Sequence, residues 1–224
     1  GGGGETPSTP VASMLGVGAV SGAPNTEKGK KSDTTFTSGS LKAARRAAGA
    51  VKHAVDRVLL GRNRNAFAVV RPPGHHAGVG GLLEGAESCG FCIFNNVAAG
   101  ALHALHAHRA RCGKVAIIDI DVHHGNGTQE IVKKYTEPDR LYFFSTHLYD
   151  TDEKTDYKFY PGSGLGFDAD EDGDAGNIVN VPLAPQWRAS TVSTAISKSK
   201  AREELQEIKD VIREERGGRG GGRR

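Results

Sequence analysis

The chain has 224 residues and a formal net charge of +3, and many of its 31 glycines lie near the two ends. This length suits one domain with a substantial core and argues against two. The near balance of acidic and basic residues excludes binding to polyanions through overall charge. No apolar run approaches the length of a membrane span. Three cysteines without a secretory signal indicate a reducing compartment, with Cys89 and Cys92 as buried free thiols.

The composition divides the chain into three parts. Residues 1–36 are rich in Gly, Ser, Thr and Pro, which predicts a disordered segment. Residues 188–224 are charged, with a narrow apolar stripe and then an Arg/Gly-rich end, which predicts a solvated helix and tail. A weaker alternative is that this tail contacts RNA or acidic surfaces. Residues 37–187 are left as the folded domain.

Within this middle part, helical and strand patterns alternate. Apolar residues at three- and four-residue spacing predict a helix over 40–60, ended by Gly61. The later patterns predict strands over 66–70, 115–120, 141–145 and 178–181, and helices over 95–110 and 127–135. Strands that are apolar throughout and alternate with helices indicate an α/β fold, a three-layer parallel sheet with helices on both faces.

The end of the strand at 115–120 carries three ionisable side chains. Alternation in an extended chain places Asp119, Asp121 and His123 on one side. Two carboxylates that point the same way repel each other unless a cation or a proton lies between them. Because Zn²⁺ accepts both oxygen and nitrogen ligands, the pattern favours a zinc site over satisfied polar caps.

The end of the strand at 66–70 carries His75 and His76, after a stiff Pro-Pro-Gly turn. A neutral imidazole can take a proton from water, and an imidazolium can return it to a leaving amine. The spacing alone leaves a pair of surface histidines equally open. His103, His106 and His108 have no carboxylate near them in sequence, so they are interpreted as surface residues.

Several motifs in a fixed order resemble the histone deacetylase and acetylpolyamine amidohydrolase family, in its class II branch. The resemblance covers about half of the chain. The matching stretches are Arg71-Pro72-Pro73-Gly74-His75-His76-Ala77, Gly90-Phe91-Cys92-Ile93-Phe94-Asn95-Asn96, Ile118-Asp119-Ile120-Asp121-Val122-His123-His124-Gly125-Asn126-Gly127, Ser145-Thr146-His147, Tyr160-Pro161-Gly162-Ser163-Gly164 and Asn180-Val181-Pro182-Leu183.

The resemblance implies a role for each matching residue. His75 and His76 resemble the catalytic pair, with Asp119 and Asn126 as their respective orienting partners. Asp121 and His123 resemble two of three zinc ligands, and Gly90 and Phe91 resemble walls of the acyl-lysine tunnel. A structural potassium ion is implied near a set of residues shared in part with the zinc site: Asp119, Asp121, His123, Ser145 and Thr146. The implied reaction is hydrolysis of the acetyl-lysine amide.

Two family segments are not found in this sequence. One carries the third zinc ligand, an Asp in a Ser-Ala-Gly-Phe-Asp-Ala segment after Asn-Val-Pro-Leu, and the other carries a carbonyl-polarising Tyr after Gly-Gly. Residues 166–169 imitate the first segment but precede Asn180. The resemblance therefore implies an incomplete, truncated deacetylase domain of the arginase/deacetylase type, with little or no activity on its own.

Three functional hypotheses follow. The first is a zinc-dependent protein deacetylase of the nucleus or cytoplasm, which acts on acetylated histone tails or other acetyl-lysine proteins within a corepressor complex, without a membrane and without sequence-specific nucleic-acid binding. The second is a catalytically inactive fragment or pseudoenzyme that serves as a protein-interaction module. The third is a manganese ureohydrolase on the same fold, which the His75-His76 loop does not fit.

Overall fold

The computed structural model describes residues 33–83, 86, 88–165, 176–185 and 206. These residues fall into two compact units. The first unit is drawn from 1–119, 125–144 and 172–179, and the second from 120–124, 145–171 and 180–224. Three predictions fall largely or wholly outside the described residues. Of the segment over 1–36 expected to be disordered, only 33–36 are described, and of the tail over 188–224 only residue 206 is described. The motif at 166–169 is not described at all.

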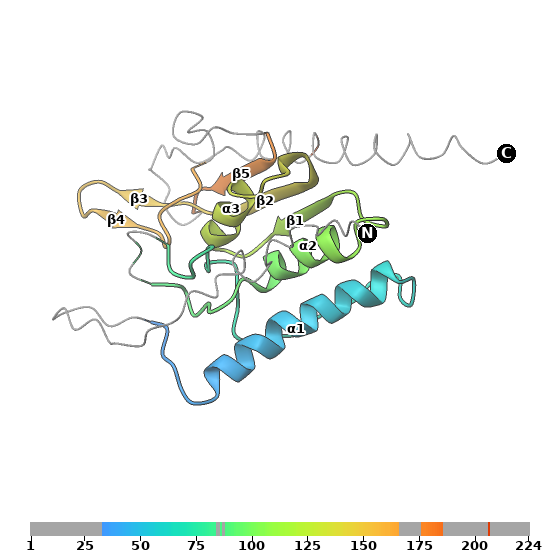
Figure 1. Cartoon of the computed structure of the whole chain (residues 1–224). Coiled ribbons are helices and arrows are strands. Elements are labelled where there is room, and N and C mark those ends of the chain that lie inside the picture. Colours follow the sequence, from blue (N-terminus) through green and yellow to red (C-terminus); the bar gives the residue numbers. More distant parts are fainter. Residues whose placement is uncertain (1–32, 84–85, 87, 166–175, 186–205, 207–224) are drawn as a thin grey trace, which may run out of the picture. The chain divides into compact units, whose positions relative to one another are not determined.

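Three strands form a parallel sheet. They are β1 (Val115–Asp119), β2 (Leu141–Leu148) and β5 (Ile178–Leu183), which lie side by side in the order β1-β2-β5 (Figure 1). This confirms the predicted α/β class and three of its four strands. Strands β2 and β5 each begin in the first unit and end in the second.

The second unit contains a short antiparallel hairpin that the sequence did not predict. Strand β3 (Thr151–Asp152) pairs with β4 (Tyr157–Lys158), with Thr151 opposite Lys158. Strands of two residues are too short to show an alternating pattern, which explains why they were missed.

The three predicted helices are confirmed, with slightly shorter bounds. They are α1 (Ser40–Leu59), α2 (Asn96–Ala107) and α3 (Asn126–Lys133), and a 3-10 turn follows at Pro138–Arg140. Helix α2 begins at a side-chain cap, since Asn95 Oδ1 accepts a hydrogen bond from the Ala98 N–H at 3.0 Å. None of the helices within the described ranges is both long and apolar enough to cross a bilayer.

Helices α2 and α3 pack against one face of β1 and β2 to form the core. Leu105, Val132, Leu141 and Phe143 are completely buried there. Strand β2 buries every second residue, from Leu141 through Phe143 to the polar Ser145 and His147. The buried face of this strand therefore changes along its length from apolar, at Leu141 and Phe143, to polar, at Ser145 and His147.

The predicted strand over 66–70 is wrong. None of these residues is in a strand, and Phe67 and Val69 are 93% and 86% exposed. An apolar run becomes a strand only when neighbouring strands take its backbone hydrogen bonds and another layer covers its side chains. No partner strand pairs with this segment within the described part of the chain, and its large apolar side chains stay exposed.

The face of β1 that points away from the core is also uncovered in the described structure. Ile117 is buried in the core, whereas its neighbour Ile118 is 61% exposed. This matches the expectation of an incomplete domain, because apolar residues of a parallel sheet are normally covered on both faces. Exposed apolar surface of this kind favours association.

Cys89, Cys92 and Cys112 are free thiols. Of the two expected to be buried, Cys92 is buried and Cys89 is only half-buried. Cys92 is buried, and burial raises the pKa of its thiol to about 12. Burial also raises the thiol pKa of Cys89, with a smaller contribution from the charge of Asp33, and burial raises that of Cys112. Thiols held in the protonated form are poor nucleophiles, which argues against redox chemistry at the Cys89–Cys92 pair.

We predict that Cys92 resists alkylation in the folded chain. Brief iodoacetamide treatment at about pH 8, followed by mass spectrometry, should leave Cys92 unmodified, since almost none of it is thiolate at that pH. The same treatment in guanidinium chloride should modify all three cysteines. Rapid native modification of Cys92 would contradict its burial.

We also predict opposite outcomes for one substitution at two positions. Phe143→Ala should lower the free energy of unfolding by about 3–5 kcal/mol, because it empties a completely buried site in the core. Phe67→Ala should change it by less than about 0.5 kcal/mol, because Phe67 is almost fully exposed. Urea unfolding followed by circular dichroism measures both, and similar losses in the two variants would contradict the packing described here.

Candidate functional site

The loop that carries the two adjacent histidines is anchored at the beginnings of α2 and α3. The Asn96 side chain donates to the Pro72 carbonyl at 3.0 Å, and the Asn95 side chain donates to the Ala77 carbonyl at 3.0 Å. From α3, the Thr128 N–H donates to the His75 carbonyl at 3.0 Å. These bonds satisfy the backbone of a loop that is largely buried, and they fix where its side chains point.

His75 is held by the carboxylate at the end of β1. Its Nδ1 lies 2.8 Å from Oδ2 of Asp119, and both side chains are mostly buried. A carboxylate accepts hydrogen bonds and cannot donate them when ionised, so the proton of this contact is on Nδ1 of His75. The structure thus brings together the first pair that the resemblance implied.

His76 is held by a neutral amide instead. Its Nδ1 lies 2.8 Å from Oδ1 of Asn126, and the same oxygen accepts the Gly127 N–H at 3.1 Å. The Gly127 bond fixes which end of the Asn126 amide faces the ring, because only the oxygen can accept it. His76 must therefore donate from Nδ1, which makes Nε2 the basic nitrogen of the neutral ring.

The two imidazoles lie against each other and below a tight turn. Their ring centroids are 4.1 Å apart, and His76 is only 3% exposed. Gly90 covers His76 in a left-handed conformation, with φ of 52°, and a side-chain carbon there would collide with Cδ2 of His76. A glycine is required at this position for both reasons.

Phe91 follows in the same left-handed conformation and is exposed, with φ of 64°. Its N–H donates to Thr34 Oγ1 at 3.1 Å. Its side chain lines an open pocket of about 260 Å³ whose other walls are Asp33, Thr34, Thr35, Ser40, Ala43, Pro72 and Ile93. The two residues assigned to a tunnel wall thus occupy different positions: Gly90 against the buried histidine and Phe91 at an accessible hollow.

The Asp121–His123 pair belongs to the second unit. The His123 backbone N–H donates to Asp121 Oδ1 at 2.8 Å, and Nδ1 of His123 lies 3.1 Å from the same oxygen. The His123 ring stacks on Phe159, with centroids 5.1 Å apart and planes 4° from parallel. Tetrahedral zinc with bonds of about 2.0 Å separates adjacent ligand atoms by about 3.3 Å. The pair therefore fits two corners of such a site.

The remaining residues of the implied potassium set are divided between the two units. Asp119 lies in the first unit, against His75, and the others lie in the second. Ser145 is buried, with its Oγ 2.9 Å from Nδ1 of His147, and Thr146 is half-buried beside it in β2. The potassium site stays a prediction.

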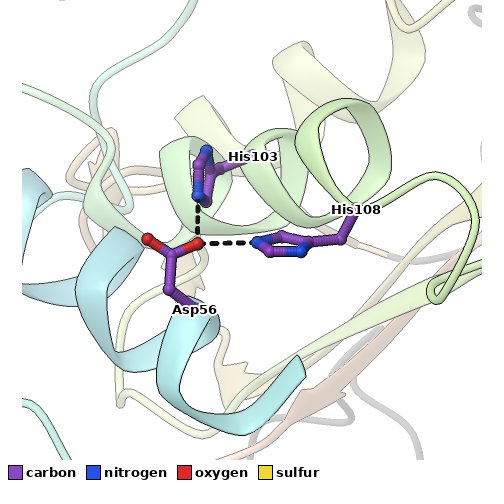
Figure 2. A group of neighbouring side chains, drawn as sticks. All are labelled: Asp56, His103 and His108. Carbon is purple, nitrogen blue, oxygen red and sulfur yellow. Dashed lines mark hydrogen bonds and ion pairs between the residues drawn. The ribbon is translucent and has the colours of Figure 1, made fainter. Parts of the chain in front are cut away.

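One cluster was missed by the sequence analysis. His103 and His108 were interpreted as surface residues without a carboxylate nearby, and this is wrong because Asp56 of α1 lies against both (Figure 2). Within the described residues, these three are the one group of three His, Cys, Asp or Glu whose ligand atoms all lie within 4.8 Å of one another. A local sequence pattern could not predict the cluster, since Asp56 is 47 positions from His103.

Comparisons with known proteins show the family of the chain. The family model of the histone deacetylase domain matches residues 11–207. Type-2 histone deacetylase 1 of Dictyostelium discoideum is 44% identical over 149 residues, which are 66% of this chain and 9% of that protein. Histone deacetylase 15 of Arabidopsis thaliana is 42% identical over 151 residues, which are 67% of this chain and 24% of that protein.

A solved structure shows the same fold. The crystal structure of the HDA15 HD domain is 41% identical, with a TM-score of 0.54, and the match covers 67% of this chain and 39% of that one. The chain thus spans well under half of the solved domain and at most about a quarter of the two relatives named above. Since the family model matches most of its residues, the protein belongs to the histone deacetylase family.

Proposed function

We propose that this chain supplies the proton-transfer machinery of a zinc-dependent deacetylase that hydrolyses acetyl-lysine amides in histones or other proteins. The observation that carries the proposal is the contact of His76 Nδ1 with an Asn126 oxygen whose orientation the Gly127 N–H fixes. This contact presents Nε2 of a buried histidine as a base. Family membership supports deacetylation as the reaction.

In this proposal His76 moves the proton. Nε2 removes a proton from the water that attacks the acetyl carbonyl, and the resulting imidazolium returns it to the departing lysine amine. Asn126 is neutral, so it orients the ring without stabilising a permanent positive charge on it. A base that must also act as an acid requires such a balanced environment.

His75 has a different partner and therefore a different role. Asp119 Oδ2 lies 2.8 Å from its Nδ1, and this contact fixes the orientation of the ring. The ring centroids of His75 and His76 are 4.1 Å apart, so the His75 ring restricts where the His76 ring can lie. We propose that His75 positions His76 in this way.

Zinc would be held in part by Asp121 and His123, which offer one oxygen and one nitrogen ligand 3.1 Å apart. When bound, zinc lowers the pKa of water and polarises a carbonyl. Catalytic zinc sites normally use three protein ligands. Among the described residues, no third His, Cys, Asp or Glu completes a compact group with these two.

The substrate side of the proposal rests on Gly90 and Phe91. Phe91 is exposed at the open pocket, and its ring offers apolar surface to the methylene chain of an acetylated lysine. Gly90 packs directly on His76, because a side-chain carbon there would collide with the ring. We further propose that the protein acts in the nucleus or cytoplasm, on acetylated histone tails or other acetyl-lysine proteins, within a corepressor complex.

We predict that the 224 residues alone release little or no acetate from an acetyl-lysine peptide. The reason is the ligand count, since the family resemblance identifies only Asp121 and His123 as zinc ligands in this sequence, where three are normal. Robust zinc-dependent turnover by the purified chain, abolished by His76→Ala, would show that the ligand count is wrong.

A chimera tests the proton-transfer proposal itself. Residues 40–183 of this chain would replace the matching segment of Arabidopsis histone deacetylase 15, to which the chain is 42% identical. The chimera should deacetylate an acetyl-lysine peptide, and His76→Ala should lower kcat by roughly 10²–10⁴-fold, the usual contribution of a general acid–base group.

The matched control for this chimera is His53→Ala, which makes the same substitution at an exposed position of α1. It should leave kcat within about twofold, because surface substitutions away from special features have little effect. A folded chimera that keeps its turnover when His76 is removed would overturn the proposal.

A further inference from the structure

The cluster of Asp56, His103 and His108 lies where α1 and α2 pack closely together. Gly100 makes this approach feasible, because a side-chain carbon there would lie 2.6 Å from Cγ1 of Val51. Asp56 follows Val51 on α1 and His103 follows Gly100 on α2. The helices therefore present a carboxylate and an imidazole to each other just beyond their point of contact.

The three side chains converge on one point. Oδ1 of Asp56 lies 2.6 Å from Nε2 of His103 and 2.6 Å from Nε2 of His108, and Figure 2 shows the two rings reaching this oxygen from different directions. Both histidines are mostly buried, while Asp56 is partly open to solvent. The cluster is therefore held by two hydrogen bonds and is still partly accessible to an ion.

The backbone around the cluster favours a cation. Asp56 lies in the last turn of α1, and His108 is the C-terminal cap of α2. Helix C-termini carry partial negative charge, so a carboxylate there is unfavourable unless positive charge offsets it.

We propose that Asp56, His103 and His108 bind a divalent transition-metal ion of the zinc class, which clamps α1 to α2. Two imidazole nitrogens and one carboxylate oxygen are a ligand set that Zn²⁺ accepts, with a remaining position for water. Ligand atoms around zinc are about 3.3 Å apart, so each Nε2 needs to move only about 0.7 Å from Asp56 Oδ1 to admit the ion. Each imidazole then carries its proton on Nδ1, which leaves Nε2 unprotonated to bind the metal.

This metal is distinct from the zinc proposed for catalysis. All three ligands belong to the first unit, and none has a role in the proposed acetyl-lysine hydrolysis. Its ligands come from α1, from α2 and from the C-terminal cap of α2. The backbone at this cap is fixed, because the His108 carbonyl accepts hydrogen bonds from the N–H groups of Arg111 at 2.7 Å and Cys112 at 2.8 Å. Its proposed consequence is stability of the helix pair.

The test uses Co²⁺ and Zn²⁺ with the full 224-residue chain. A background of Asp121→Asn with His123→Ala first removes the other proposed metal ligands. In that background we expect one equivalent of Co²⁺ to give the visible absorption of a low-coordinate ion, and Zn²⁺ to displace it. Zinc at about 100 times its Kd should raise Tm by about 5–10 °C.

Two variants remove ligands while keeping hydrogen-bonding groups of similar shape, namely Asp56→Asn and His103→Gln. Each should weaken metal binding by more than the roughly 10–100-fold typical of outer-sphere changes, and should abolish the zinc-dependent rise in Tm. Circular dichroism establishes that each variant is folded, and His108→Gln replaces any variant that is not.

His106→Ala is the matched control. It lies on the same helix but contacts the ring of Tyr135, so it should leave metal affinity unchanged. The proposal is overturned if the background chain binds no Co²⁺ stoichiometrically, if Asp56→Asn and His103→Gln retain their affinity, or if His106→Ala loses it as well.

Discussion

Burial of the His75–His76 loop against the beginnings of α2 and α3 is the constraint on which the site depends. A buried loop must find a partner for each backbone polar group, and here Asn95, Asn96 and Thr128 provide several of them. Asn95 also caps α2, so one side chain both starts a helix and fixes the loop. The histidines consequently have little freedom, and their different acceptors determine what each can do.

The hydrogen bonds that orient His75 and His76 are all made within the first unit, whereas some apolar side chains of that unit are exposed. Ile118 and Phe67 are exposed, whereas His76 is almost entirely buried and its ring partner is in place. The contacts that orient the histidine pair therefore do not require the layer that would cover these apolar side chains. The placement of His76 and the apolar cover of the sheet are therefore separable properties of the described structure.

Periodicity predicted the elements whose apolar face meets a partner inside the described structure, including all three helices. The prediction failed at 66–70, because this apolar run has no neighbouring strand among the residues that the structure describes. The pairing of His76 with Asn126 came from the family resemblance, since contacts 50 positions apart leave no local signal. The Asp56 cluster depends on how closely α1 and α2 approach at Gly100, and neither spacing nor resemblance encodes that distance.

The tautomer of His76 tests the central claim most directly. Nitrogen-15 NMR of the imidazole side chains at neutral pH would identify which ring nitrogen carries the proton in the neutral form. The hydrogen bond to Asn126 predicts protonated Nδ1 and unprotonated Nε2 for His76, in contrast to the mixed tautomers expected of the exposed His53. A proton on Nε2, or a tautomer mixture like that of His53, would contradict the account.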